Sequence, residues 1–394
     1  MLHLLIGPAG CGKSFSLREE MATLSAKGER VFCIVPEQYS FESERALYPY
    51  GVESVSFERL CDAVMRRCGG LAGEYAGETV QLLFMRQALR DLKGTLGAFQ
   101  KVAARPDFAG EMLSTILELK RAGVTPDALR EASGEKEGEE SLLRLKLRDL
   151  ALIMESYNAL ISRSMIDPAG RLETVAGMIE ESEFFKGTRV YIDEFKSFTA
   201  VQMKVIRLML RQADEVTVSL CIDPEHKGTG LFETLLETRR ALLSEAAKAG
   251  IAVASPKVMK GYRRFASEGI PALGEGVFAA APIPAQSGGK VRGYILRDPY
   301  EEASFAAAEV KRLVREEGYA YREIALLARD LSTRAPSLEA AFDRYGMPYF
   351  LDGGRSVEAM PLTRFIRHRL QLMVRPLDRE EGLMLLKCGV LPID

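Results

Sequence analysis

The chain has 394 residues, more than one hydrophobic core usually serves, so we expect two or three domains or one domain with a large insertion. Apolar residues make up 47% and charged residues 27%, values that exclude a disordered chain. The 53 Lys and Arg residues nearly balance the 55 Asp and Glu residues, giving a net charge of −2. Any polyanion that binds must therefore meet a local basic patch rather than a global positive field.

The cysteine and histidine pattern argues against a zinc site. Six cysteines are scattered without a CxxC pair, and only three histidines occur. Free thiols in a long chain are typical of the reducing cytosol. The N-terminus has no basic region before its short apolar run, and no apolar stretch is long enough to span a membrane. We therefore expect a cytoplasmic protein without a signal peptide or a membrane partner.

The first part of the chain predicts an α/β domain. Apolar runs at 2–6 and 31–35 indicate buried strands, and the segment 13–27 between them has the spacing of a helix. A strand, a Gly-rich turn, a helix and a second strand form a βαβ unit, which predicts a parallel sheet. A further strand is expected at 52–57.

The pattern from 77 to 183 is helical, as at 81–92, 108–122 and 142–162, and its acidic segment 134–140 is expected to be an exposed loop. Strand signals return at 189–192 and 216–222. We therefore expect a first domain formed by 1–76 and 184–251, interrupted by a helical insertion at 77–183.

A second, smaller α/β unit is expected near the C-terminal end. Residues 252–290 are rich in Ala, Gly, Pro and Ser and are interpreted as a linker or long loop. The unit at 291–394 would then contain strands at 291–296, 323–328 and 349–351 and helices at 301–317 and 338–345.

The strongest motif is a GxxxxGKS phosphate loop, which consists of Gly7, Pro8, Ala9, Gly10, Cys11, Gly12, Lys13 and Ser14. Its glycines let backbone N–H groups converge on phosphate oxygens, and the following helix directs its positive end at the same anion. Lys13 would reach the β- and γ-phosphates, and the Ser14 hydroxyl would bind Mg²⁺. The motif lies between a predicted strand and a predicted helix, so the alternative of a plain Gly-rich turn is weak.

A second motif is VYIDEF at 190–195, an apolar strand that ends in two carboxylates. Asp193 would hold the Mg²⁺ shell, and Glu194 would polarise the attacking water. Taken alone, such a pair is more often the solvated start of a loop.

Residues that follow the second strand are candidates for nucleic-acid contact. Glu37, Gln38, Tyr39 and Phe41 lie at the edge of the sheet where ligands bind in open α/β folds. Stacking on the aromatic rings and polar contacts would suit a single strand. A turn with Tyr39 and Phe41 packed inward remains an equal alternative.

Arginines of the second unit are weaker candidates. Arg329 follows the strand predicted at 323–328 and would approach the γ-phosphate on domain closure, although loop arginines are mostly solvated. Arg364, Arg367, His368 and Arg369 have helical spacing, which fits a DNA-facing stripe less well than a solvated helix face.

Together these segments resemble the superfamily-1 helicase core, and more closely the B subunit of the AddAB (RexAB) helicase–nuclease family. The resemblance rests on HLLIGPAGCGKS, IVPEQYSFESE, VYIDEFKSFTAVQ and EIALLARDLSTRAPSLEAAFDRYGMPYFLDGGRSV, which are spread over nearly the whole chain. It implies a RecA-like P-loop NTPase domain (1A) with its helical insertion (1B) and the start of a second RecA-like domain (2A). It also implies ATP and Mg²⁺ as cofactors, and DNA and an A-type subunit as partners in double-strand-break repair.

The chain departs from an active helicase in ways that imply a weak or inactive motor. No adenine-reading glutamine motif precedes Gly7, and the strand VTVSLCIDP lacks a GDxxQ pattern. The chain is about a third of such a subunit, so we expect a fragment without the nuclease and iron–sulfur segments.

Two other functions stay open from the residues alone. One is a P-loop kinase that phosphorylates a small molecule, although the helical insertion and the second unit exceed what such an enzyme needs. The other is a structural module that binds a partner and keeps the phosphate loop as a relic.

Overall fold

The computed structural model describes residues 1–69, 75–105, 107–134, 141–163, 165–223, 230–265, 269–276, 291–352, 357–358 and 360–390. The chain divides into two compact units, Met1–Val291 and Arg292–Asp394. Among the described residues, no helix is both long enough and apolar enough to cross a bilayer.

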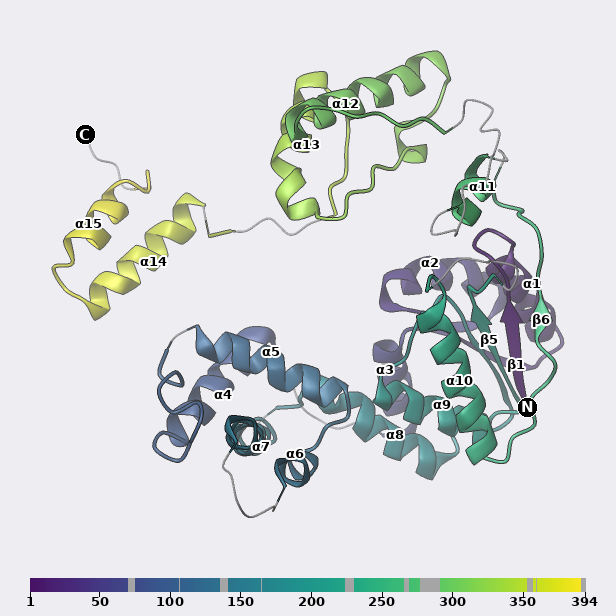
Figure 1. Ribbon diagram of the computed structural model, residues 1–394, viewed down its shortest axis with the longest axis horizontal. Helices are drawn as coiled ribbons and strands as arrows, with labels where there is room; N and C mark the ends of the chain where they lie inside the picture. The colour runs from purple at the N-terminus through teal and green to yellow at the C-terminus, as the bar shows by residue number, and fades with distance from the viewer. Residues whose placement is uncertain are drawn as a thin grey trace. The chain divides into compact units, whose positions relative to one another are not determined.

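The first unit is built on a six-stranded sheet in which every neighbouring pair of strands is parallel (Figure 1). The strand order is β3-β2-β4-β5-β1-β6. The strands are β1 (Leu2–Ile6), β2 (Arg30–Ile34), β3 (Glu53–Val55), β4 (Thr188–Ile192), β5 (Glu215–Leu220) and β6 (Lys257–Val258). The strands predicted at 2–6, 31–35, 52–57, 189–192 and 216–222 are confirmed within two residues.

Helices cover both faces of this sheet because successive strand residues point to opposite sides. Leu4, Phe32 and Val190 belong to the core on one face, whereas their neighbours Leu5, Cys33 and Tyr191 belong to the core on the other. The first face is covered by α3 (Phe57–Cys68), α8 (Arg171–Ser182), α9 (Ala200–Gln212) and α10 (Glu233–Lys248). The second face is covered by α1 (Lys13–Ala26) and α2 (Glu37–Leu47), which the short helix η1 (Tyr48–Tyr50) follows. Both strand faces are buried, which explains why the strands are continuous apolar runs.

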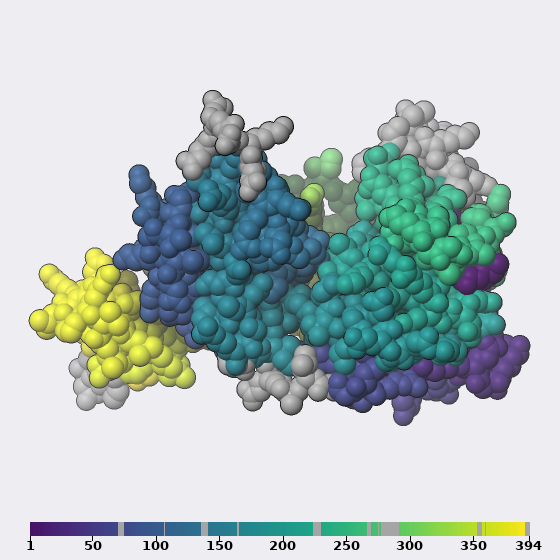
Figure 2. Space-filling model, turned by 90° about the horizontal axis from the view of Figure 1, so that it is seen from below, coloured from purple at the N-terminus to yellow at the C-terminus, as the bar shows by residue number. Residues whose placement is uncertain are grey.

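A helical segment with its own core interrupts the sheet between β3 and β4. It consists of α4 (Glu78–Asp91), α5 (Phe108–Arg121), α6 (Pro126–Ser133) and α7 (Leu142–Ile161), packed around residues such as Met85, Ile116 and Tyr157. The helix α8, which η2 (Pro168–Gly170) precedes, also falls in the range 77–183, but Val175 and Ile179 bury it in the sheet core instead. The space-filling view shows the teal residues, to which α8 and α9 belong, as a continuous packed surface (Figure 2). Most of the loop expected at 134–140 lies outside the described residues.

The segment expected to be a linker begins as part of the sheet. Residues Lys257 and Val258 form β6, which pairs with Leu5 and Ile6 of β1. The composition that predicted a linker comes from 271–289, whereas 251–259 contains the β-branched and apolar residues of a strand. The helix α11 (Gly269–Gly276) follows, and 277–290 lies outside the described residues.

The second unit contains α12 (Pro299–Glu316), η3 (Tyr321–Glu323), α13 (Leu331–Tyr345), α14 (Pro361–Val374) and α15 (Arg379–Leu386). The helix predicted at 301–317 is confirmed within two residues, whereas the one predicted at 338–345 begins earlier, at Leu331. Helix α12 packs on α13 around Ala307 and Phe342. The strands predicted at 291–296, 323–328 and 349–351 are wrong for this structure, which gives these residues no strand pairing. A strand needs a neighbour for its backbone N–H and C=O groups, and side chains such as Leu327, which is 95% exposed, bury no face here.

Candidate nucleotide site

Residues 7–14, which the motif predicts to be a phosphate loop, run from the end of β1 into the start of α1. Gly12 caps α1 with a φ of 94°, and no side chain among the described residues caps the first amides of that helix. These N–H groups therefore remain available for an anion at the positive end of the helix. At Gly7, a Cβ atom would lie 2.6 Å from Cys11 Sγ and 2.7 Å from the Met259 carbonyl oxygen, so only glycine fits.

Lys13 folds back onto the loop that precedes it. Its ammonium group donates to the carbonyl oxygens of Gly7 and Pro8, each at 2.9 Å, and lies 3.8 Å from Cys11 Sγ. Carbonyl oxygens are weaker partners for an ammonium group than phosphate oxygens, because hydrogen bonds between two charged groups are the stronger class. The lysine is thus held over the loop by contacts that a phosphate would replace.

A side-chain hydrogen bond joins the loop to the acidic end of β4. The Ser14 hydroxyl donates to Glu194 Oε1 at 2.9 Å. Glu194 has a φ of 66°, a left-handed backbone that costs a non-glycine residue about 1–3 kcal/mol and that clusters at functional sites. The two predicted motifs, 180 residues apart in the sequence, therefore meet at one place.

Asp193 points back into the sheet and not toward Ser14. The residue is 7% exposed, and its carboxylate accepts hydrogen bonds from the Ser219 hydroxyl and, at 3.0 Å, from the Glu194 amide. Asp193 thereby anchors the turn that presents Glu194. Hydroxyl and carboxylate oxygens are the ligands that Mg²⁺ prefers, so Ser14 and Glu194 fit a magnesium ion held together with phosphates. A direct role of Asp193 in the Mg²⁺ shell stays a prediction, because its described contacts are to Ser219 and to the Glu194 amide.

Two residues of β5 and its end belong to the site, although the sequence analysis did not select them. Ser219 is the one hydroxyl in an otherwise apolar stretch from 218 to 222, a signal that points to a buried hydrogen bond. Cys221 follows β5. Burial raises the pKa of the Cys221 thiol, and the nearby Lys13 ammonium offsets part of that rise.

A segment that no motif predicted also contacts the phosphate loop. We define the strap as residues 259–265, which follow β6. Its first residue, Met259, donates from its amide to the Ile6 carbonyl oxygen at 2.7 Å. Near its end, the amides of Arg263 and Arg264 donate to the Gly10 carbonyl oxygen at 2.8 and 3.1 Å. The strap therefore crosses the loop between two backbone anchors.

The four residues predicted to contact DNA lie on the first turns of α2, just beyond the end of β2. Glu37, Gln38, Tyr39 and Phe41 are all exposed, with Phe41 76% accessible. The alternative in which both rings pack inward is wrong, because Ser40, Ser43 and Leu47 form the buried face of this helix. The rings thus stand on the surface at the carboxyl edge of the sheet.

The predicted arginines of the second unit have different environments. Arg329 is exposed and precedes α13, so its approach to a γ-phosphate stays a prediction. Arg364, Arg367 and Arg369 lie on α14 as expected. The stripe does not include His368, which is 5% exposed and places Nδ1 2.5 Å from Glu381 of α15.

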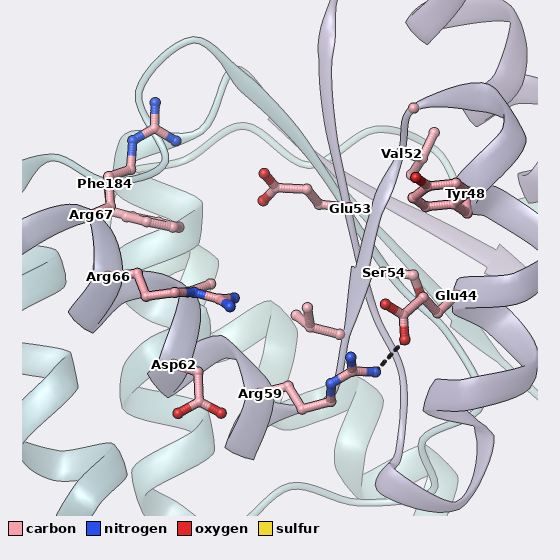
Figure 3. Close-up of a pocket in the computed structure, with 13 residues that line it drawn as sticks. Glu44, Tyr48, Val52, Glu53, Ser54, Arg59, Asp62, Arg66, Arg67 and Phe184 are labelled. Atoms are coloured by element: carbon pink, nitrogen blue, oxygen red, sulfur yellow. Dashed lines mark hydrogen bonds and ion pairs between the residues drawn. The ribbon is translucent and has the colours of Figure 1, made fainter.

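A separate pocket of about 630 Å³ lies beside the edge strand β3 (Figure 3). Three arginines and three carboxylates line it, namely Arg59, Arg66, Arg67, Glu44, Glu53 and Asp62. Arg59 donates to Glu44, and Arg67 lies over the Phe184 ring. Three strands separate β3 from β1 in the sheet, and no residue predicted for nucleotide, metal or DNA lines this pocket.

Comparison with known proteins assigns the chain to a family. The family model described as "ADDB, N-terminal" matches residues 4–273. A protein of Symbiobacterium thermophilum, named as the B subunit of an ATP-dependent helicase/deoxyribonuclease, is 33% identical over 95% of this chain and 34% of its own length. Proteins of the same name from Moorella thermoacetica and Clostridium tetani are 30% and 27% identical over 100% of this chain and 36% of theirs.

The chain thus spans about a third of the length of these curated relatives. The matched range contains the phosphate loop, the acidic end of β4 and the strap. The chain belongs to the AddB N-terminal family.

Proposed function

We propose that this chain is the nucleotide-binding, helicase-like part of a B-type subunit of a DNA-repair helicase–nuclease. It binds ATP with Mg²⁺ at the phosphate loop, contacts DNA through the start of α2 and works beside an A-type subunit. The observation that carries the proposal is the hydrogen bond from Ser14 to Glu194, because it brings the phosphate loop and the strand-end carboxylates to one site. The names of the relatives, which include ATP dependence, helicase and deoxyribonuclease, support it.

The residues of the site divide the work of binding. The amides that follow Gly12 receive phosphate oxygens, and Lys13 exchanges the carbonyl oxygens of Gly7 and Pro8 for phosphate. Magnesium, when bound, neutralises phosphate charge next to the Ser14 hydroxyl. Glu194 is placed to orient and polarise water, and Asp193 fixes the backbone that carries it.

A weak or inactive motor is part of the proposal. The residues that follow β5 are Cys221, Ile222 and Asp223, and none supplies the glutamine that would link nucleotide state to DNA. Cys221 instead sits next to Lys13. Binding of nucleotide then serves to shape a DNA-reading surface more than to drive unwinding.

Lys13→Ala tests the nucleotide site. Equilibrium titration with a fluorescent ATP analogue and Mg²⁺ should show about tenfold or more weaker binding, since one charged contact to phosphate is worth at least about 1.4 kcal/mol. Lys27→Ala, at the exposed C-terminal end of the same helix, is the matched control and should bind like the wild type. Equal affinity of wild type and Lys13→Ala would favour a relic phosphate loop in a structural module.

Filter binding of a single-stranded oligonucleotide at two salt concentrations tests the DNA role. We expect the affinity to fall as salt rises and the double variant Tyr39→Ala, Phe41→Ala to bind more weakly, because each stacked ring is worth about 1–3 kcal/mol. Tyr48→Ala is the control, since Tyr48 is also exposed but lies at the other end of α2. Absence of DNA binding, alone and with an A-type subunit, would favour a small-molecule kinase.

A further inference from the structure

The strap carries two arginines to the rim of the phosphate loop. At Gly12, the nearest atoms to a Cβ would be those of the Arg263 side chain, with Cδ at 3.1 Å and Nε at 3.9 Å. Gly12 directly precedes the first amides of α1, so the Arg263 side chain lies along the loop that would enclose a phosphate. Arg264 lies against Gly10, because a Cβ atom placed at Gly10 would be 3.4 Å from the Cβ atom of Arg264.

The backbone of Arg263 is fixed in place. Its amide donates to the Gly10 carbonyl oxygen at 2.8 Å, and the Phe265 ring covers Gly10 so closely that a Cβ there would lie 2.8 Å from Cε2. The Phe265 ring also packs against Tyr262, with ring centroids 5.8 Å apart. Because the chain is held on both sides of Arg263, little backbone conformational entropy is lost when its side chain meets a ligand.

Arg263 is an exposed residue and, within the described parts of the chain, its side chain forms neither an ion pair nor a hydrogen bond. Other arginines near the sheet do have carboxylate partners: Arg189 binds Glu29 and Glu215, and Arg207 binds Glu245. An unpaired guanidinium next to an amide-lined loop creates a positive field that favours a polyanion, and its planar fork matches two phosphate oxygens.

We propose that Arg263 is a second phosphate-binding residue of this site, which contacts the polyphosphate of a bound nucleotide from the side opposite α1. The inference rests on the proposed function, because it assigns a residue to the same nucleotide. It also gives the strap a role: the phosphate loop and the strap both contact the ligand, so bound nucleotide stiffens the strap.

Titrations with Mg²⁺-ATP and with Mg²⁺-tripolyphosphate on the full chain test the inference. Arg263→Ala should weaken both ligands by about tenfold, since the contact is to phosphate and not to the base. Arg263→Lys should recover part of the loss, because an ammonium group keeps the charge and loses the fork. Arg264→Ala is the matched control and should change either affinity less than about threefold, and the thermal unfolding midpoint should not change in any of the three variants.

The outcomes separate this inference from the proposed function. If Lys13→Ala loses binding and Arg263→Ala does not, the role of Arg263 is refuted and the nucleotide site stands. A loss in Arg263→Ala for ATP but not for tripolyphosphate would place Arg263 on the nucleoside and refute the phosphate contact. Equal losses of affinity in Arg263→Ala and Arg264→Ala would show that the strap acts through its total positive charge, which would refute a specific contact by Arg263. Absence of nucleotide binding by the wild type would overturn both proposals.

Discussion

At the phosphate loop, the glycine positions allow a close backbone approach that any larger residue would block. Gly7 has backbone and thiol atoms within 2.7 Å of where a Cβ would stand, and Gly12 has a φ of 94°. The motif predicts these positions because its glycine spacing reflects such close approaches. The motif does not predict the left-handed backbone of Glu194 or its bond to Ser14, since both depend on β4 and β1 reaching the same edge of the sheet.

Glu194→Gln separates the two expected tasks of that side chain. The amide oxygen of glutamine accepts the Ser14 hydrogen bond as the carboxylate does, so the affinity for Mg²⁺-ATP should stay within about threefold of the wild type. An amide cannot take a proton from water, so any phosphate release that the wild type shows should be lost. A coupled assay of phosphate release measures this, and unchanged turnover would mean that Glu194 does not activate water.

The buried cysteines give a prediction on pH. Burial raises the pKa of Cys33 to about 12 and that of Cys61 to about 12, above their ordinary value near 9.0. The charge of Asp193 raises the pKa of Cys33 further in the same direction. Because the neutral thiol is favoured in the fold, this stabilisation is complete below about pH 9 and is lost as pH rises through about 12.

A thiol titration with an aromatic disulfide reagent at about pH 8 checks the burial that raises these pKa values. The exposed Cys68 should react quickly, and Cys33 and Cys61 should react only after unfolding, because the thiolate is the reactive form. Cys68→Ser should remove the fast phase and leave the slow one. Fast labelling of Cys33 in the folded chain would refute its burial.

At the scale of elements, the sequence pattern predicted those helices and strands whose boundaries depend on residues close together in the sequence. The periodicity placed α5 and α7 within a residue of their observed ends, because each buries an apolar stripe in its own core. The pairing of β6 with β1 was missed because two residues carry little pattern and their partner strand lies at the start of the chain. The strands expected in the second unit were predicted but did not form, since an apolar run forms a strand only beside another strand.

One carboxylate fixes a loop of the helical insertion. Asp149, on α7 and 3% exposed, accepts hydrogen bonds at 2.9 Å from the amides of Gly97 and Phe99. Asp149→Ala leaves both amides without a partner, which should cost about 2–4 kcal/mol of the free energy of unfolding. Hydrogen exchange should become faster at those two amides, with the solvent-exposed Asp127→Ala as control. Unchanged exchange would contradict the role of Asp149.

At the scale of the whole molecule, residues 7–14, the acidic end of β4 and the strap all belong to the first unit. The family resemblance rested on motifs spread over the chain in combination, and the family is confirmed. Single segments do not reveal it. The curated relatives are about three times as long as this chain.

The most direct test of the central claim is a crystal structure of the chain with Mg²⁺ and a non-hydrolysable ATP analogue. We predict that the phosphates lie on the first amides of α1, that Lys13 has left the carbonyl oxygens of Gly7 and Pro8, and that Ser14 has turned from Glu194 to the metal. An analogue bound at another face, with Lys13 still bonded to Gly7 and Pro8, would contradict the account.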